Sequence, residues 1–211
     1  MQSVALIDYG SGNLRSAEKA LVRVAEGKAE IVVTDDPDAI ARADRIVLPG
    51  VGAFAACMGA LEARPGVIEA MTDAVRRRGA PFLGICVGMQ LLATRGLEFG
   101  ETRGLDWVPG DVRKLEPADP SIKIPHMGWN ALTDVADHPL FAPLRNGDAV
   151  YFTHSFALFP GDPADVTASV EHGGRFAAAV ARGNVAGVQF HPEKSQKPGL
   201  ALLQRFLEWR P

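Results

Sequence analysis

The chain has 211 residues, a length that suits one substantial hydrophobic core, and no linker divides it, so we expect a single domain over residues 1–211. It is 47% hydrophobic and 22% charged, with a formal charge of -3 and no dense Lys/Arg run, which argues against nucleic acid or an anionic membrane as the main partner. No leader-like start, membrane-length apolar run or metal-site spacing of Cys and His is present, so we expect a cytoplasmic protein with no metal or other cofactor.

The first half of the chain alternates strands with helices. A helix is expected from Leu14 to Val24, a short one begins at Asp36-Pro37, and a third has its apolar face along residues 67–75. Short apolar runs between them predict strands over residues 3–8, 30–34, 45–48 and 81–85. This alternation is typical of a parallel sheet covered on both faces.

The second half changes character, because Pro and Gly become frequent and strands follow one another directly. His172-Gly173-Gly174 and Arg182-Gly183-Asn184 are expected as hairpin turns. The predicted strands cover residues 149–159, 166–171, 175–181 and 185–190, and a last helix covers 198–209. The fold class is therefore α/β, with a mostly parallel central sheet flanked by helices and added antiparallel strands in the second half.

Cys86 stands between the strand ending at Ile85 and a helix expected over 89–94, closed by Gly96. Gly84 and Gly88 flank it at the spacing of a nucleophile elbow, in which a strand turns sharply into a helix and exposes the central side chain. Helix-terminal N–H groups favour the thiolate, the form that attacks carbonyl carbon. The alternative is that Cys86 is a small buried residue at an ordinary turn, and Cys57 is interpreted as a core or packing residue.

A thiol nucleophile needs a histidine oriented by a carboxylate. His191 ends an apolar strand, and Glu193 follows two residues later, on the same side of an extended chain. His138 and His172 lie in expected loops and are predicted to be solvated, whereas His126 and His154 have no carboxylate at a useful spacing. These patterns favour His191 as the base and Glu193 as its orienting group, against a solvated strand end.

The turn Pro49-Gly50-Val51-Gly52 follows the third strand and should emerge at the same sheet edge as Cys86. Its glycines allow backbone amides to turn toward a ligand, and the Val87 amide next to the nucleophile is a natural second donor for an oxyanion.

Gly10-Ser11-Gly12, with Asp35 further on, offers a rival dinucleotide-binding interpretation. It fails at the third glycine of that motif, where Arg15 would crowd the approach of helix to strand.

Taken together, the runs Gly84–Gln90, Pro49–Gly52 and His191–Glu193 resemble the motifs of the class I glutamine amidotransferases, the triad glutaminases, in the family's order and over nearly the whole chain. A second set is similar to the glutaminase subunits of imidazole glycerol phosphate synthases, a branch of that family: residues 8–13, 125–130 and 151–156. The run from His126 to Asn130 discriminates best within the family.

The resemblance implies hydrolysis of glutamine to glutamate and ammonia. Cys86 would attack the side-chain amide and form a thioester, His191 would protonate the departing ammonia and then activate water, and Glu193 would orient His191. The amides of Val51 and Val87 would form the oxyanion hole. The substrate would be held by Gly50, Gly52, Gln90, Glu98, His154 and Ser155.

The resemblance also implies a partner, a cyclase subunit with a (βα)8-barrel fold in a heterodimer. The cyclase would use the ammonia to form imidazole glycerol phosphate and an aminoimidazole carboxamide ribotide in histidine biosynthesis. We expect glutaminase activity to rise when this partner biases the glycine-rich turn. The residues expected to face it are Asn13, His126, Met127, Gly128, Trp129, Asn130 and Lys194.

One position departs from the family pattern, since the run that begins at Tyr151 usually ends in tyrosine and here ends in Phe156. Two other functions remain open from the residues. The first alternative is a glutaminase subunit of another synthase, serving anthranilate, aminodeoxychorismate, guanylate or pyridoxal phosphate formation. The second is a non-enzymatic binding module on the same fold.

Overall fold

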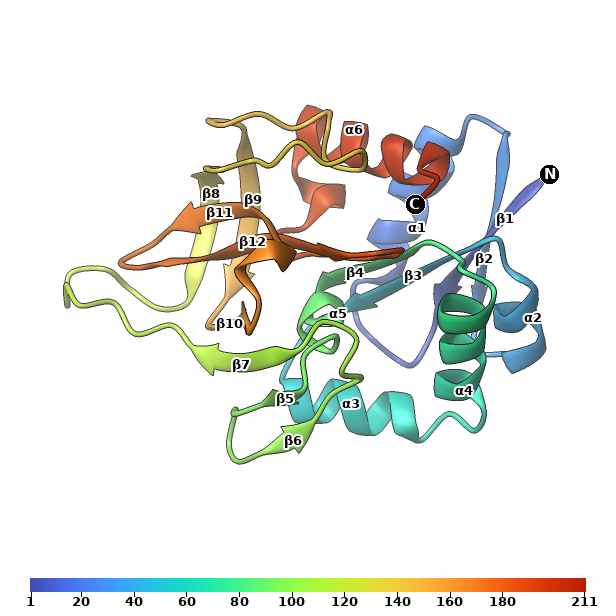
Figure 1. Cartoon of the computed structure of the whole chain (residues 1–211), viewed down its shortest axis with the longest axis horizontal. Helices are drawn as coiled ribbons and strands as arrows, with labels where there is room; N and C mark the ends of the chain where they lie inside the picture. The colour runs from blue at the N-terminus through green and yellow to red at the C-terminus, as the bar shows by residue number, and fades with distance from the viewer.

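The computed structural model describes residues 1–211 and is built on a seven-stranded sheet in the order β11-β12-β13-β4-β3-β1-β2 (Figure 1). Five of these strands are parallel: β1 Gln2–Ile7, β2 Ala29–Thr34, β3 Arg45–Gly50, β4 Phe82–Cys86 and β13 Val185–Val188. The other two, β11 Val166–Glu171 and β12 Arg175–Arg182, extend the β13 edge as antiparallel strands. The predicted fold class is confirmed.

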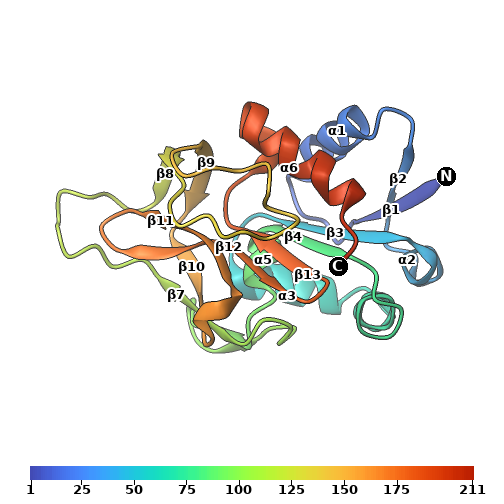
Figure 2. The ribbon, with the colours of Figure 1, turned by 45° about the horizontal axis from the view of Figure 1, so that its top comes forward.

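Helices cover both faces of this sheet (Figures 1 and 2). α1 Leu14–Ala25 and α6 Gln196–Glu208 pack against each other on one face. The opposite face carries α3 Phe54–Glu62 and α4 Val67–Thr72, which continues as a π-helical turn Asp73–Arg77, and α2 Pro37–Arg42 packs beside α4. Asp36 caps α2 by accepting from the Asp38 amide at 3.0 Å, as the Asp-Pro pair predicts. Helix α3 is an element that the sequence patterns did not reveal.

Two smaller sheets come from the second half of the chain. One has the order β10-β7-β5-β6 and the other pairs β8 with β9. Their bounds are β5 Arg95–Gly96, β6 Thr102–Arg103, β7 Gly110–Lys114, β8 His126–Ala131, β9 Ala149–His154 and β10 Phe156–Pro160, with short 3-10 turns at Pro163–Asp165 and Pro192–Lys194. The hairpin turns at 172–174 and 183–184 lie where they were expected.

The predicted strand over 149–159 is wrong in one respect, because the chain breaks at Ser155. β9 pairs with β8, whereas β10 pairs with β7 in a different sheet. A hydrogen bond between His154 Nδ1 and Phe156 O, at 2.9 Å, closes the turn between them. This turn therefore joins two sheets rather than continuing one strand.

The helix expected over 89–94 is also wrong, since α5 covers only Val87–Gln90 and Gly96 lies in β5. The carbonyl groups of Leu91, Leu92 and Ala93 accept hydrogen bonds from the amides of residues 105–108. A loop distant in sequence thus takes the acceptors that a longer helix would have needed. Gly96 instead allows close packing, because a Cβ there would lie 2.5 Å from the Phe54 ring.

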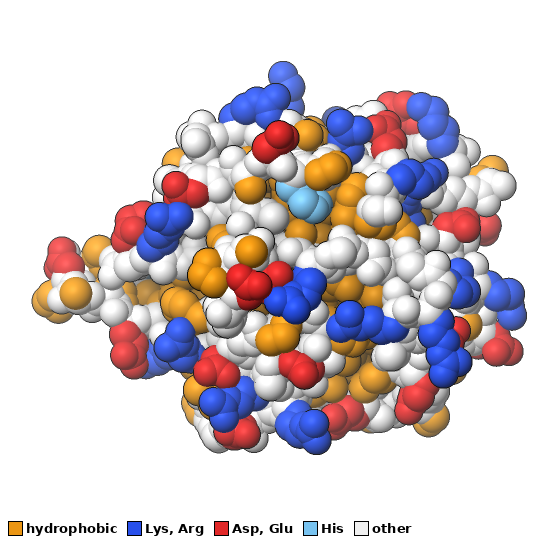
Figure 3. All heavy atoms as spheres, viewed as in Figure 1, with side chains coloured by type: hydrophobic (Ala, Val, Ile, Leu, Met, Phe, Trp, Pro, Cys, Tyr) orange, Lys and Arg blue, Asp and Glu red, His pale blue; other side chains and the backbone are white.

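Surface charge is mixed on the face that Figure 3 shows, where Lys, Arg, Asp and Glu side chains are interspersed. No helix combines the length and the apolar character needed to cross a membrane. The carboxyl ends of β3 and β4 lie side by side, with Gly50 paired to Cys86, and β13 ends one position earlier with Val188 beside Ile85. Residues that follow these strands therefore converge at one sheet edge.

Candidate active site

Cys86 occupies a strained turn between β4 and α5. Its φ of 55° is positive, a backbone conformation that residues with a side chain rarely adopt. The flanking glycines are required by close packing: a Cβ on Gly88 would lie 1.8 Å from Leu48 O, and one on Gly84 would lie 2.5 Å from Gly88 O. The turn therefore has the geometry of a nucleophile elbow, with the thiol at the N-terminus of α5.

His191 and Glu193 form a buried pair beside Cys86. His191 Nδ1 and Glu193 Oε1 are 2.7 Å apart, and each side chain is only 1% exposed. His191 Nε2, on the other side of the ring, is buried and has no hydrogen-bond partner. The pairing arises differently from our expectation, because Pro192–Lys194 forms a 3-10 turn instead of an extended strand and this turn brings Glu193 back toward the ring.

The charges of this pair reinforce one another. Burial alone lowers the pKa of His191, but contacts with Cys86 and Glu193 outweigh it and raise the pKa to about 9. Burial likewise acts to raise the pKa of Glu193, but His191 and Asn13 draw it below its ordinary value. The resting arrangement therefore favours an imidazolium between a carboxylate and a thiol, which can stabilise a thiolate and later release a proton.

Asn13 joins the pair from the loop before α1. Its Nδ2 donates to Glu193 Oε1 at 2.5 Å and lies 3.2 Å from His191 Nδ1. The sequence placed Asn13 at a partner surface, whereas the structure shows its side chain bound to the carboxylate. Asn13 is half-buried, so it contacts the triad and also reaches the surface.

A cavity of about 270 Å³ opens beside Cys86. Phe54 N donates to Glu98 Oε2 at 2.8 Å, which fixes that carboxylate at the N-terminus of α3. Gly50, expected among the substrate residues, is not part of the lining, whereas Thr153 and Phe156 are lining residues that the sequence analysis missed. The lining consists of Val51, Gly52, Cys86, Val87, Gln90, Glu98, Thr153, His154, Ser155 and Phe156.

The two expected oxyanion donors, the backbone amides of Val87 and Val51, differ in whether they already donate a hydrogen bond. Val87 is the first residue of α5, so its amide has no carbonyl acceptor within the helix. The Val51 amide instead donates to Ser11 Oγ at 3.1 Å. Cys57, buried as expected, donates its thiol to Val51 O at 3.3 Å. The Val51 amide must leave Ser11 before it can donate to a ligand in the cavity.

Gln189, which the sequence analysis did not single out, lies against the nucleophile. It is fully buried just after β13, and its Nε2 donates to Cys86 Sγ at 3.7 Å. Its Oε1 accepts from Gln90 Nε2 at 3.0 Å, and Gln90 Nε2 also donates to Phe156 O at 2.8 Å. Both N–H groups of Gln90 are thus occupied, which leaves Oε1 as its hydrogen-bonding atom for a ligand. The sequence signal that could have identified Gln189 is its position two residues before His191.

The residues expected to face a partner divide into outward and inward groups. Met127 and Trp129 on β8 are 64% and 48% exposed, but His126 is 3% exposed because successive strand side chains alternate between faces. Lys194 Nζ lies 5.5 Å from the centre of the Tyr151 ring, which in turn contacts Trp129 edge to face. The side chain of His126 is therefore directed into the molecule and not toward a partner.

His138 and His172, predicted to be solvated, are half-buried. The ring of His138 packs near Trp209, and His172 Nε2 is 3.0 Å from Lys123 O. Tertiary packing of α6 and of the 115–125 segment covers loops that look exposed in sequence. No group of three or more His, Cys, Asp or Glu side chains is arranged to hold a metal ion.

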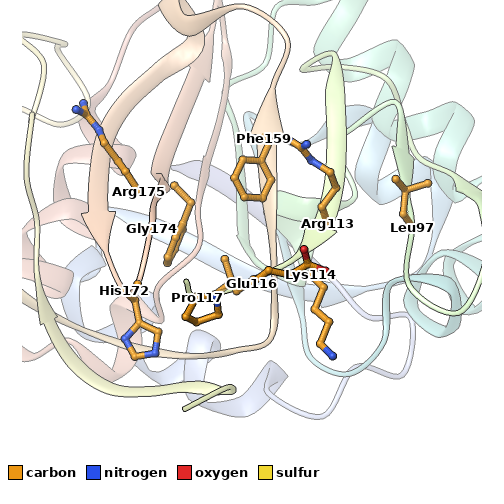
Figure 4. A pocket seen from close by; sticks show the side chains of 12 residues that line it. Leu97, Arg113, Lys114, Glu116, Pro117, Phe159, His172, Gly174 and Arg175 are labelled. Atoms are coloured by element: carbon orange, nitrogen blue, oxygen red, sulfur yellow. The ribbon is translucent and has the colours of Figure 1, made fainter. Parts of the chain in front are cut away.

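A larger cavity, of about 460 Å³, lies away from Cys86, between β7, β10 and the hairpin of β11 and β12 (Figure 4). The Arg113 guanidinium lies over the Phe159 ring, 4.3 Å from its centre. Figure 4 shows Arg175 and Lys114 extending in different directions, so the basic groups of this cavity do not converge on a common point. The geometry for covalent chemistry belongs to the smaller cavity.

Comparisons with known proteins identify the family. A sequence model described as glutamine amidotransferase class-I matches residues 5–209. The chain is 64% identical to a protein of Caulobacter vibrioides, with 100% of both chains covered, and 56% identical to one of Zymomonas mobilis, covering 99% of this chain and 97% of the other. Each relative is named imidazole glycerol phosphate synthase subunit HisH.

Among solved structures, a crystal structure titled glutamine amidotransferase aligns with a TM-score of 0.73, covering 97% of both chains at 18% identity, so it supports the fold. Because the family match extends over almost the whole sequence, the chain belongs to the class-I glutamine amidotransferases.

Proposed function

We propose that the chain is the glutaminase subunit of an imidazole glycerol phosphate synthase, hydrolysing glutamine to glutamate and ammonia. Two observations support this: the buried His191–Glu193 pair beside a thiol at an elbow, and full-length relatives carrying that name at 64% and 56% identity. The pairing of His191 with Glu193 at the sheet edge of Cys86 supports the assignment of glutamine hydrolysis. The names of the relatives support imidazole glycerol phosphate synthase over the other synthases.

The reaction begins with the Cys86 thiolate attacking the side-chain amide carbon of glutamine. The imidazolium of His191 then gives its proton to the amide nitrogen and the C–N bond breaks. Ammonia departs, and the acyl group remains on Cys86 as a thioester. Next, His191 takes a proton from water and the hydroxide attacks the thioester. The carbon–sulfur bond breaks to restore the Cys86 thiolate, and glutamate leaves after its new carboxyl group has released a proton to solvent. Glu193 holds the ring through Nδ1 and stabilises its charged form.

Substrate binding is assigned to the groups that line the smaller cavity. Gln90 Oε1 and the Glu98 carboxylate are acceptors that suit the α-ammonium group of glutamine, and His154 and Ser155 line the same cavity. Phe156 replaces a family tyrosine, but its carbonyl group holds Gln90 as any residue's would. The missing phenol is therefore compatible with glutamine binding.

The second oxyanion donor is proposed to become available only on activation. In the resting chain the Val51 amide is bound by Ser11, so Val87 alone faces the developing oxyanion. A partner that favours an alternative orientation of Pro49–Gly52, the end of β3 and the turn after it, would supply the second donor and raise the rate.

That partner is proposed to be a cyclase subunit with a (βα)8-barrel fold, bound as a heterodimer in the cytoplasm. The exposed side chains of Met127, Trp129 and Lys194, with Asn13 near the triad, are the proposed contact surface. The cyclase would consume the ammonia to form imidazole glycerol phosphate and an aminoimidazole carboxamide ribotide. All of residues 1–211 are proposed to act as one domain.

The test is to measure glutamate release from glutamine with the chain alone, with a recombinant cyclase subunit, and with the cyclase and its nucleotide ligand. We expect slow release alone and the fastest release in the complete mixture. Equal and rapid turnover in all three would contradict the coupling, and no turnover in any would contradict the glutaminase assignment. A cyclase that gains no ammonia from glutamine would point to a different synthase.

A further inference from the structure

Two buried histidines meet next to the glutamine cavity and take no part in the chemistry described above. His126 on β8 and His154 on β9 are 3% and 7% exposed, and His126 Nδ1 lies 3.0 Å from His154 Nε2. β8 and β9 pair directly at these two positions. His154 also lines the cavity, so His126 is one hydrogen bond away from a residue of the cavity wall.

Both rings are neutral. Burial lowers the pKa of His126 to about 3 and that of His154 to about 4, and the neighbouring imidazoles lower both further, while the hydrogen bond to Phe156 O opposes this shift at His154. A neutral imidazole has one N–H donor and one acceptor nitrogen. Each ring can therefore donate only one hydrogen bond.

The partners of these rings allow a single assignment of protons. Phe156 O can only accept, so His154 carries its proton on Nδ1, 2.9 Å away, and its Nε2 is an acceptor. His126 must then donate from Nδ1 and keep a lone pair on Nε2. That lone pair faces Asn130 Nδ2 at 3.2 Å. The Asn130 amide is oriented in turn, because its Oδ1 accepts from the Ala131 amide at 2.8 Å.

The chain of bonds continues into the catalytic site. Phe156 O accepts from His154 Nδ1 and from Gln90 Nε2, and Gln90 Nε2 also donates to Gln189, whose amide reaches Cys86 Sγ. Phe156 O is thus the shared acceptor that joins the histidine pair to Gln90. The orientation of the turn at residues 154–156 therefore depends on His154 keeping its proton on Nδ1.

The ring of His126 is itself fixed by stacking. It lies between Phe152, with ring centres 4.6 Å apart, and His172, with ring centres 4.1 Å apart. Both contacts are near parallel, at 26° and 25°. The ring cannot rotate out of line with His154 without losing both neighbours.

We infer that His126 is a positioning residue for glutamine hydrolysis, which donates Nδ1–H to His154 and thereby holds the turn of residues 154–156 against Gln90. This inference rests on the proposed function. Without this donor, His154 Nε2 is a buried acceptor with no partner, and the ring gains by moving its proton or turning. The cavity wall then loses its fixed shape, while Cys86, His191 and Glu193 keep their own contacts.

The first experiment compares His126→Leu, which removes the donor, with His126→Asn, whose side-chain amide can donate from nearly the same place as Nδ1. Each complex with the cyclase subunit is inactivated with the diazoketone analogue of glutamine, and the half-saturation concentration and the maximal rate are measured separately. We expect His126→Leu to raise the half-saturation concentration roughly tenfold, with a maximal rate within about twofold of the wild type. His126→Asn should restore most of the binding.

His172→Gln is the matched control, because it removes one stacked ring but leaves Phe152 stacked on His126 and keeps every link of the hydrogen-bond chain. We expect its half-saturation concentration to stay within about twofold of the wild type. Unchanged binding in His126→Leu would overturn the inference. So would equal losses in the Leu and Asn variants, which would indicate packing alone, or a fall confined to the maximal rate.

A second measurement needs no variant that might unfold. Long-range nitrogen-15 NMR of the wild-type chain distinguishes protonated from bare imidazole nitrogens. We expect His126 and His154 both to be neutral near pH 7 with the proton on Nδ1. The opposite tautomer at either ring, or a charged ring, would overturn the inference even if the chain proved to have no glutaminase activity. Absence of inactivation in the wild type would count against the proposed function alone.

Discussion

The elbow at Cys86 and the end of strand β3 with the turn that follows it, Pro49–Gly52, lie side by side at one sheet edge but are held in opposite ways. The elbow is fixed by close backbone packing, since Gly88 meets Leu48 with no room for a Cβ. The neighbouring strand is held by side chains, with Ser11 on the Val51 amide and Tyr9 on Pro49 O at 2.7 Å. Packing of backbone on backbone leaves one arrangement, whereas a hydroxyl contact can be exchanged for another. The nucleophile is therefore ready in the resting chain, and one oxyanion donor is not.

The largest effect should come from removing the nucleophile. Cys86→Ala should lower glutamine hydrolysis by at least ~10⁴-fold, because no other group can form the thioester. Its complex with the cyclase should still consume added ammonia, since the fold is kept. Glutamate release and ammonia-dependent cyclisation measured on the same preparation test both points. Residual glutaminase activity near the wild-type rate would exclude Cys86 as the nucleophile.

Alanine at two glycines tests the difference in packing directly. Gly88→Ala places a Cβ 1.8 Å from Leu48 O, so we expect a loss of roughly 3 kcal/mol or more in the free energy of unfolding. The Cβ added in Gly52→Ala meets no atom within 4 Å, and the only cost is the φ of 107°. We therefore expect the free energy of unfolding to fall by about 1–2 kcal/mol. Urea unfolding of both variants gives the comparison. Similar losses would mean that the strand is as tightly packed as the elbow.

The pH dependence of stability reports how firmly the triad is preassembled. The pKa of His191 is raised in the folded chain to about 9, so its contribution is complete below the unfolded pKa of about 6.5 and is lost as pH rises toward 9. The change is on the order of 2–3 kcal/mol. Glu193→Gln should reduce this alkaline loss, because the neutral amide favours the imidazolium less. Identical pH profiles from 6.5 to 9 in the two proteins would show that the pair contributes no such coupling.

Releasing the strand should have a smaller effect. Ser11→Ala removes the acceptor of the Val51 amide, a contact worth about 1 kcal/mol, so the glutaminase rate of the chain without partner should rise up to about fivefold. The rate of the complex should change little, because activation would already have broken this bond. Steady-state rates with and without the cyclase subunit distinguish the two states. A rate without partner that falls in Ser11→Ala would assign Ser11 a direct role.

The smallest effect is expected at Phe156. Phe156→Tyr restores the family's phenol, but the contacts of residue 156 with Gln90 and His154 are made by its carbonyl group. The kcat and KM for glutamine should therefore stay within about twofold of the wild type. A larger gain would reveal a use for the hydroxyl that the backbone contacts do not supply.

Local patterns were sufficient for much of the fold and for the reactive groups. The alternation of apolar runs with helices predicted the parallel sheet, and Gly84-x-Cys86-x-Gly88 predicted the elbow because only glycine permits such close backbone approach. The break at Ser155 and the early end of α5 could not be predicted, because distant segments supply the competing hydrogen bonds. Gln189 was missed because its only signal in the sequence is its position two residues before His191, and its contact with Cys86 is made only when β13 pairs with β4.

The sequence by itself predicted Cys86 and His191 as the candidate nucleophile and base and the sheet edge where they meet, because spacing along strands and turns fixes which residues emerge together. It also specified the motifs that mark the family. Only the tertiary structure decided that Glu193 reaches His191 through a 3-10 turn, that Ser11 holds the Val51 amide, and that His126 faces inward to His154. Each of these depends on hydrogen bonds between segments far apart in the chain, and the direction of such bonds is set only when the segments pack.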